Sequence, residues 1–470
     1  MIEKILIANR GEIAVRIIRA CREMGIRTVA VYSEADRDAL HTQLADEAVC
    51  IGPAPSTDSY LNMQNIISAT LVSGADAIHP GFGFLSENSR FARLCEQCNI
   101  VYIGPPSDVI SRLGNKSEAR NTMIKAGVPV IPGSKEAVYD VKEGAKIAKK
   151  IGYPVIIKAA LGGGGKGMRV AQNPEEFEQS FQTARKEAGI AFGDETMYIE
   201  HFVKHPRHIE FQILADNYGN VIHLGERDCS VQRRHQKVVE YAPAFTIPDE
   251  TREKIFDAAI RLCKNVGYVN AGTLEFLVDR DNNPYFIEMN PRIQVEHTVS
   301  EMVTGIDIVQ AQILVAEGYA LDSEEIHIKS QEDVTCNGYS IQTRVTSEDP
   351  ANNFLPDTGE MTVYRSGSGN GIRLDGGCAY VGAIVSPHYD SLLVKIISHD
   401  RTFAGAVRKS ERALQEMRIR GVKTNIPFLI NVLNHPTFQS GQCYTTFIEE
   451  TPELFRLTHS LNRATKIIEF

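Results

Sequence analysis

Several protein classes are excluded by what the sequence lacks. No run of apolar residues approaches the roughly 18 that a membrane-spanning helix needs. The first residues, Met1 to Ala8, contain neither the apolar core and cleavage site of a signal peptide nor the Arg- and Ser-rich composition of a transit peptide. The nine cysteines are an odd number, which fits no disulfide framework. We therefore expect a cytoplasmic protein of a reducing compartment, with no membrane partner.

An excess of positive charge is also missing. Against 59 Asp and Glu stand 50 Lys and Arg, and the net charge of −9 argues against a nucleic-acid partner. The 470 residues, 43% hydrophobic and 23% charged, are ordinary for a globular protein. At about 150 residues per domain they predict roughly three domains. Cys95 and Cys98 form a lone CxxC without a second pair, so helix packing explains them better than a metal site.

Strands and helices alternate at the start of the chain. Lys4–Ala8 and Thr28–Tyr32 are predicted strands, and apolar residues at helical spacing lie between them. Two more strands are expected near Ala75–Ile78 and Ile100–Ile103, each followed by Gly and Pro. We predict a parallel α/β domain over residues 1–114, because such sheets carry ligands in the loops after their strands.

A glycine-rich loop dominates the next section, residues 115–203, which opens with an expected helical connection. A strand-like run ends at Leu161, four glycines, Lys166 and Gly167 follow, and Met168 starts another strand-like run. The loop contains GxGxxG, yet no helix follows, and Gly167 stands where a Walker A loop has Ser or Thr. What remains is a hairpin tip of bare backbone that can fold over phosphates. The alternative is a glycine hairpin with no ligand.

An acidic hairpin is predicted within a long α+β section, residues 204–446. Thr273–Val278 and Tyr285–Asn290 are strand-like runs joined by turn residues. A symmetric hairpin places Glu275 opposite Glu288 on one face, two residues before Asn290. Because opposed like charges are unfavourable in a sheet, the pair favours a cation such as Mg²⁺ or Mn²⁺. The alternative is two solvated acids on an exposed face.

The same face is expected to continue beyond the hairpin. Asn290, Arg292, Gln294 and Glu296 keep a period of two, and Pro291 favours an extended chain before it. Arg292 would then fork onto a planar oxyanion such as bicarbonate or a carboxylate, and Glu296 would act as a base beside it. The alternative is a salt-bridged edge strand.

A further stretch, residues 226–237, is dense in charged and amide side chains. Its charge suits a triphosphate and a small anion, and its alternative is a solvated surface loop.

These motifs together resemble the biotin carboxylase family, a branch of the ATP-grasp ligases, over almost the whole chain. The motifs that carry the resemblance are Ala8–Ala14, His79–Asn88, Gly162–Met168, Glu226–Lys237 and Phe286–His297. The resemblance implies an ATP-grasp fold with an N-terminal parallel-sheet domain, a glycine-rich lid and a large C-terminal lobe. It also implies that residues 447–470 begin a linker to downstream domains.

The resemblance further implies the following site residues, with MgATP as cofactor and biotin as a substrate on a carrier outside this chain. ATP would be bound by Lys116, Lys158, Gly164, Gly165, Glu200, His201, Phe202, Val203, His208, His235, Glu275 and Glu288. The metals would be bound by Glu275, Glu288 and Asn290. Bicarbonate would be bound by Lys237, Arg292 and Val295, and the catalytic residues would be Lys237, Arg292, Glu296 and Arg344. Glu296 would deprotonate bicarbonate, Arg344 would stabilise the biotin enolate, and Phe82 would lie near biotin.

The implied reaction forms carboxyphosphate and ADP from bicarbonate and ATP, and then carboxylates biotin. The C-terminal third looks most like pyruvate carboxylases, at Asn353–Gly359, Arg418–Leu429 and Thr451–Phe455. Biotinyl carrier and carboxyltransferase partners are then expected, with a homodimer through this domain or a tetramer at full length. The alternatives are a free-standing biotin carboxylase subunit of an acyl-CoA carboxylase, another ATP-grasp ligase, and a nucleotide-binding regulatory module.

The sequence departs from the family pattern at two positions. The family often has Tyr where Phe82 stands, so a lost hydroxyl would weaken biotin positioning. It usually has Lys where His201 stands in the adenine segment. Since that contact is expected through the backbone, we predict little loss of ATP affinity.

Overall fold

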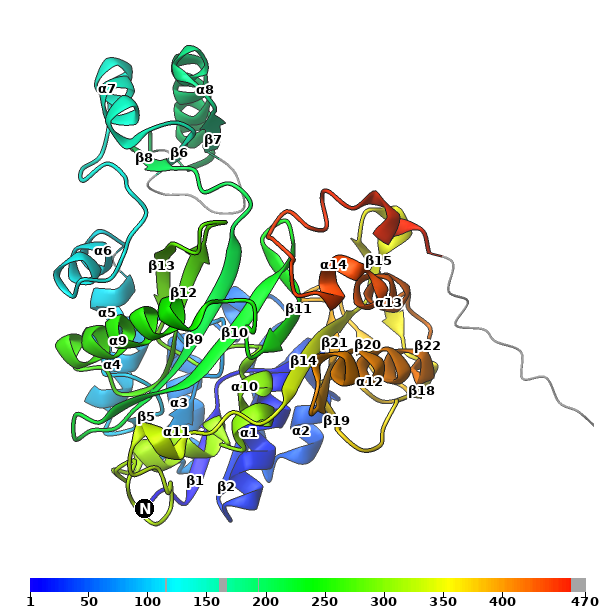
Figure 1. The fold of residues 1–470 in the computed structure, drawn as a ribbon. Coiled ribbons are helices and arrows are strands. Elements are labelled where there is room, and N and C mark those ends of the chain that lie inside the picture. Colours follow the sequence, from blue (N-terminus) through cyan, green and yellow to red (C-terminus); the bar gives the residue numbers. More distant parts are fainter. Residues whose placement is uncertain (115, 160–166, 193, 458–470) are drawn as a thin grey trace, which may run out of the picture.

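The computed structural model describes residues 1–114, 116–159, 167–192 and 194–457. Figure 1 shows an N-terminal part, a small part that stands apart at the top of the view, and a large part built on a long sheet. Among the described residues no single helix is long and apolar enough to span a membrane, although α10 (His297–Thr304) and α11 (Ile308–Ala316), bent by 95°, meet that test as a pair.

The N-terminal part contains the predicted parallel sheet, in the order β3-β2-β1-β4-β5. Its central strands β1, β2 and β4 are largely buried, and the chain turns from β1 into α1 at Gly11, whose φ of +65° suits glycine. The strands are β1 (Lys4–Ile7), β2 (Arg27–Ser33), β3 (Glu47–Gly52), β4 (Ala77–His79) and β5 (Val101–Tyr102). The helices are α1 (Gly11–Glu23), α2 (Leu40–Leu44), α3 (Met63–Ser73), α4 (Ser89–Gln97) and α5 (Ser107–Gly114).

The small part, which we call the lid, is an antiparallel sheet in the order β7-β6-β8, covered by two helices. Phe177 and Phe181 of α8 form its core with Ile157 and Ile199. The predicted strand–loop–strand is confirmed by the pairing of β6 with β7, while the glycine loop at 160–166 lies outside the described residues. The lid elements, after α6 (Lys116–Lys125), are α7 (Val141–Ile151), β6 (Val155–Ala159), β7 (Met168–Ala171), α8 (Pro174–Phe192) and β8 (Met197–His201).

The large part is built on an eight-stranded sheet in the order β13-β12-β9-β10-β11-β14-β21-β19. Its strands are β9 (Arg207–Ala215), β10 (Val221–Arg233), β11 (Gln236–Ala242), β12 (Asn270–Val278), β13 (Pro284–Asn290), β14 (Tyr339–Thr346), β19 (Ile372–Gly376) and β21 (Leu392–Asp400). The helices that accompany it are α9 (Asp249–Val266), α10 (His297–Thr304), α11 (Ile308–Ala316), α12 (Phe403–Glu416), α13 (Ile426–Asn434) and α14 (Pro436–Gln439). Short strands pair at its periphery, namely β15 (Glu348–Asp349), β16 (Leu355–Pro356), β17 (Gly359–Glu360), β18 (Val363–Arg365), β20 (Ile384–Val385) and β22 (Arg418–Arg420).

One alternative left open by the sequence is excluded, and one expectation needs correction. The charged stretch at 226–237 is not a solvated surface loop: it forms most of β10, a two-residue turn and the start of β11, and its residues from Glu226 to Gln232 are buried. The linker expected from residue 447 does not begin there. Phe447, Ile448 and Leu454 are buried in the same core as α12 and α13, so the chain packs on the large part at least as far as Leu454.

Candidate active site

The acidic hairpin has the predicted pair of carboxylates, but not the symmetric register: Val278 pairs with Pro284 beside the turn, and a β-bulge between Glu275 and Phe276 then shifts the pairing by one residue. Glu275 of β12 lies opposite Glu288 of β13, and Thr273 lies opposite Asn290. Glu275 is buried, whereas the side chain of Glu288 reaches solvent. Asn290 closes the group, because its Nδ2 donates to Glu275 Oε1 over 2.9 Å. The two carboxylates and the amide therefore share one end of the sheet.

The row beyond the hairpin is not extended, which corrects the predicted period of two. The chain leaves the sheet after Asn290, and Glu296 has helix-like backbone angles at the start of α10. The side chains still gather, because Arg292 donates to Asn290 Oδ1 and to Gln294 Oε1, each over 3.2 Å. Arg292 also pairs with Glu87 at 3.0 Å from the N-terminal part.

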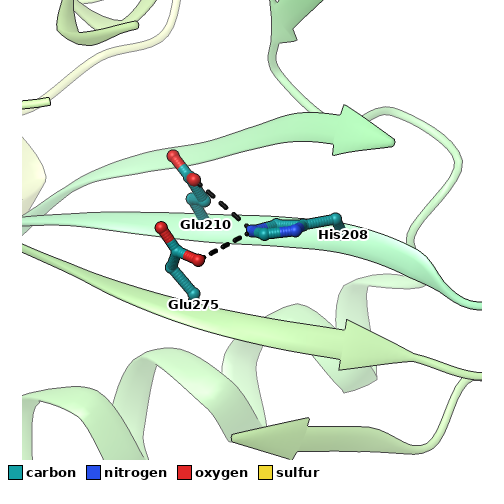
Figure 2. A group of neighbouring side chains, drawn as sticks. All are labelled: His208, Glu210 and Glu275. Carbon is teal, nitrogen blue, oxygen red and sulfur yellow. Dashed lines mark ion pairs between the residues drawn. The ribbon is translucent and has the colours of Figure 1, made fainter. Parts of the chain in front are cut away.

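His208 and Glu210, two residues apart on β9, face Glu275 on the neighbouring strand (Figure 2). His208 Nε2 lies 3.1 Å from Glu275 Oε2 and 3.4 Å from Glu210 Oε1. Burial opposes the charged imidazole, but the Glu275 and Glu210 carboxylates outweigh it and raise the pKa of His208 to about 9. His208 is therefore a cation at neutral pH.

Lys237 of β11 is the centre of the charge cluster. Its Nζ lies 2.7 Å from Glu296 Oε1 and 3.1 Å from Glu275 Oε1, and it also pairs with Glu210. Although burial works against the ammonium, these carboxylates raise the pKa of Lys237 well above its usual range. Glu275 shows the opposite shift. Burial alone would raise its pKa, but the positive charges of Lys237 and His208 lower that pKa well below its usual range.

Arg344 of β14 holds the other oxygen of Glu296. Its Nη2 lies 2.9 Å from Glu296 Oε2, and its Nε donates to Glu240 Oε1 over 2.6 Å. Glu240 is in turn held by Gln342 Nε2 at 3.0 Å. Glu296, of which only 1% is exposed, is thus a buried carboxylate with a cation on each oxygen.

Arg227 of β10 supports this cluster from inside the protein. It is fully buried and pairs with Glu210 Oε2 at 3.0 Å. Its remaining donors are taken by Gln212, Thr273 and Ser300. A buried guanidinium with every contact satisfied fixes the position of Glu210, and through Glu210 that of Lys237.

The lid residues named from the sequence lie around β6 and β8. Lys158 Nζ pairs with Glu200 Oε2 at 2.5 Å across the lid sheet. The N–H groups of His201 and Phe202 donate to Pro132 O and Pro154 O, both over 2.8 Å, so these two donors are engaged within the protein. Val203 is buried. The side chain of Lys116 and both Gly164 and Gly165 lie outside the described residues.

Three further predicted residues have distinct surroundings. His235 is exposed in the tight turn between β10 and β11, where it and Arg234 both have positive φ. Phe82 packs against the N-terminal core that contains Ile13. The carbonyl of Val295 accepts a hydrogen bond from Lys395 Nζ over 2.9 Å.

A divalent cation fits the acidic hairpin. Partial desolvation and the neighbouring Glu275 raise the pKa of Glu288, so a cation bound between these carboxylates would relieve the repulsion that remains beside the contacts of Glu275 with Lys237 and His208. Two carboxylates and the Oδ1 of Asn290 are oxygen ligands that suit Mg²⁺. The ligand atoms of His208, Glu210 and Glu275 also lie within 4.8 Å of one another. Lys237 and Arg227 already neutralise that second group, so it is better described as an ion-pair network.

Sequence reasoning missed Glu210, Glu240 and Arg227 as members of the site. The signal for Glu210 was present, because His208, Glu210 and Gln212 alternate with apolar residues on a strand that is otherwise hydrophobic. Polar residues on one face of a buried strand need partners. No comparable signal marked Glu240, whose partners come from β14 about a hundred residues later.

Family comparisons agree with this fold. Residues 1–110 match "Biotin carboxylase, N-terminal domain", residues 115–324 match "Carbamoyl-phosphate synthase L chain, ATP binding domain", and residues 342–450 match "Biotin carboxylase C-terminal domain". The chain therefore belongs to the biotin carboxylase family of ATP-grasp ligases.

Its relatives include pyruvate carboxylases. That of Pichia angusta is 54% identical over 99% of this chain, and that of Bacillus subtilis is 52% identical over all of it. This chain spans only 40% and 41% of their lengths. Among solved structures, the biotin carboxylase domain dimer of the Hydrogenobacter thermophilus 2-oxoglutarate carboxylase, in complex with MgADP, ADP and bicarbonate, is 48% identical with a TM-score of 0.90. That match covers 97% of this chain and 99% of the other.

Proposed function

We propose that this chain carries out the MgATP- and bicarbonate-dependent carboxylation of biotin, and that the residues described above perform it. The observation that carries the proposal is Glu296, whose two oxygens lie 2.7 Å from Lys237 and 2.9 Å from Arg344. A carboxylate in this position can take the proton of bicarbonate, while the two cations hold the anion that results. The bicarbonate oxygen then attacks the γ-phosphorus of ATP and gives carboxyphosphate and ADP.

Carboxyphosphate breaks down to CO₂ and phosphate, the phosphate takes the N–H proton of the biotin ureido group, and the ureido nitrogen then attacks CO₂ to give carboxybiotin. Arg344 would stabilise the biotin enolate by its guanidinium, and Arg292 and Val295 would complete the bicarbonate site with Lys237. Phe82 lies at the biotin end. Because a closed lid keeps water from a labile intermediate, the lid would close before carboxyphosphate forms.

The nucleotide would lie between the lid and the large sheet. Lys158 and Lys116 would bind phosphate oxygens, Gly164 and Gly165 would cover them, and His208 and His235 would complete the site. Because the Lys158 side chain is 37% exposed, its pair with Glu200 is worth little and is readily exchanged for a phosphate. Glu275, Glu288 and Asn290 would hold Mg²⁺, which supplies charge neutralisation on the phosphoryl oxygens when bound.

The parent enzyme that we favour is pyruvate carboxylase, supported by full-chain identities of 52–54% to two pyruvate carboxylases. Biotinyl carrier and carboxyltransferase partners follow from this proposal, as does a homodimer through this domain. All nine cysteines are free, which supports a reducing compartment such as the cytoplasm. A free-standing biotin carboxylase subunit is the second candidate, and the two differ in whether the native reading frame continues past Phe470.

The first test is ADP release from MgATP by the 470-residue chain, with and without bicarbonate and with and without free biotin. We expect release to require bicarbonate and to rise with biotin, because bicarbonate is the nucleophile and biotin removes the CO₂. A continuous coupled assay for ADP measures both. Nucleotide binding without any response to bicarbonate would instead indicate an ATP-grasp ligase that activates another carboxylate.

Replacing His201 with Lys, the usual residue of the family, should leave the Kd for ATP within about two-fold of the wild type. The imidazole Nδ1 lies 3.1 Å from the carbonyl of Gly152 within the lid, so the side chain is already engaged there. The proposed adenine contact uses backbone groups of residues 200–203 other than the N–H groups of His201 and Phe202, which donate within the protein, and the substitution keeps them. Isothermal titration with a nonhydrolysable ATP analogue checks this, and a many-fold gain in affinity would contradict it.

A further inference from the structure

A buried lysine contacts the segment that carries Glu296 from behind. Lys395 of β21 is fully buried. Its Nζ donates to the Val295 carbonyl over 2.9 Å and lies 3.0 Å from Glu12 Oε2. Asp375 Oδ2 is farther away, at 3.9 Å. One ammonium therefore joins helix α1, the end of β19 and the turn before α10.

Close packing fixes the place where this ammonium lies. The turn after β19 runs against the start of α1 so tightly that a Cβ at Gly377 would lie 2.5 Å from the Glu12 nitrogen. Glu12 is itself buried, in the first turn of α1. A buried cation needs an acceptor or a counter-charge, and Glu12 and the Val295 carbonyl are the two nearest groups that the described contacts provide.

The contact matters because of where the carbonyl sits. The Val295 carbonyl belongs to the peptide group that joins Val295 to Glu296, so fixing its oxygen fixes the backbone from which the Glu296 side chain extends. Lys237 and Arg344 hold that side chain at its other end. Glu296 is thus held at its backbone and at both carboxylate oxygens.

We propose that Lys395, with Glu12 as its counter-ion, is a positioning residue for the bicarbonate end of the active site. This rests on the function proposed above. Lys395 touches neither ATP nor bicarbonate in this proposal: it acts through the Val295–Glu296 peptide group. Its loss should therefore disturb bicarbonate use and leave nucleotide binding intact, because the lid and the acidic hairpin do not depend on this contact.

Lys395→Met is the direct test, with Arg373→Met as its matched control. Arg373 lies close to the same meeting point of α1, β19 and α10, where it pairs with Glu301 at 2.7 Å and with Asp375 at 2.8 Å. Neither of these contacts involves the Val295 carbonyl. Both variants remove a cation from the junction, so both should lower the unfolding temperature. Only Lys395→Met should lower kcat/KM for bicarbonate. The expected loss is about 100-fold, which is typical when a catalytic group such as Glu296 is misplaced by about 1 Å.

Two further variants keep the test informative if Lys395→Met does not fold. Lys395→Arg should restore most of the activity, since a guanidinium can still donate to the carbonyl. Glu12→Gln should give a loss in the same direction but only of several-fold, since the lysine remains. The measurement is ADP release in the 470-residue chain with free biotin, at varied bicarbonate and at varied ATP.

The results separate this proposal from the proposed function. KM for ATP should stay within about two-fold in every variant. If Lys395→Met loses no more bicarbonate efficiency than Arg373→Met, or loses ATP and bicarbonate efficiency equally, the positioning role is overturned and the proposed function stands. If the wild-type chain already ignores bicarbonate, the proposed function fails and the positioning role fails with it.

Discussion

Replacing Glu296 with Gln should lower bicarbonate-dependent ADP release by about 10²- to 10⁴-fold, the range that a general base contributes. The amide keeps the shape of the side chain but cannot take up a proton. It also removes the negative charge that Lys237 and Arg344 share. The nucleotide ligands on the lid and the acidic hairpin are unchanged, so ATP should still bind. Steady-state ADP release and titration with an ATP analogue measure the two quantities.

The matched control for this variant is Glu301→Gln. Glu301 is also a buried carboxylate of the α10 region, and it pairs with Arg16 at 2.8 Å and with Arg373 at 2.7 Å. The control also breaks buried ion pairs, so it should lose a similar amount of stability. Its ADP release should fall much less, because Glu301 is not one of the proposed bicarbonate residues. Full activity of Glu296→Gln, or an equal loss in both variants, would remove Glu296 from the role of base.

Replacing Arg227 with Met should lower the free energy of unfolding by about 3–5 kcal/mol, the usual cost of breaking a buried ion pair. Arg227 is fully buried, and it pairs with Glu210 and donates to Gln212, Thr273 and Ser300. Methionine fills much of the volume but satisfies none of these acceptors. Because Glu210 also holds Lys237, activity should fall together with stability.

Lys254→Met serves as the control for the stability measurement. Lys254 also pairs with a glutamate, Glu250, but the two side chains are 69% and 80% exposed. Exposed pairs of this kind contribute under about 1 kcal/mol, so this variant should unfold close to the wild type. Urea denaturation followed by circular dichroism compares the midpoints. Similar midpoints for the two variants would show that the Arg227 network does not stabilise the fold.

Local patterns predicted much of the fold. The apolar runs at Lys4–Ala8 and Thr28–Tyr32 became neighbours in the parallel sheet, because short buried strands with helical spacing between them have few other arrangements. The pairing of Glu275 with Glu288 was predicted for a hairpin symmetric about its Asp- and Asn-rich turn, yet the structure reaches it through a β-bulge between Glu275 and Phe276. Local features therefore predicted which strands pair, but not every step of their register.

Features that depend on distant partners were not predictable. The β10–β11 turn has positive φ at both Arg234 and His235, which usually calls for Asn or Gly, so the sequence carried no hairpin signal and left a surface loop open as an alternative. Its charges are buried because each finds a partner on another strand, as Arg227 does with Glu210. The assumed extension beyond Pro291 failed because the chain turns there into α10.

The continuous eight-stranded sheet limits where this chain can be cut into recombinant fragments. The ladder between β11 and β14, from Val239 beside Thr343 to Ala242 beside Ser340, joins the ATP-binding region to the C-terminal region. A recombinant fragment that stops between α11 and β14 would leave β11 as a long bare edge, which invites pairing with other molecules. Separately expressed halves would therefore tend to precipitate. A split reporter or an inserted tag belongs in the exposed turns rather than in the segment between α11 and β14.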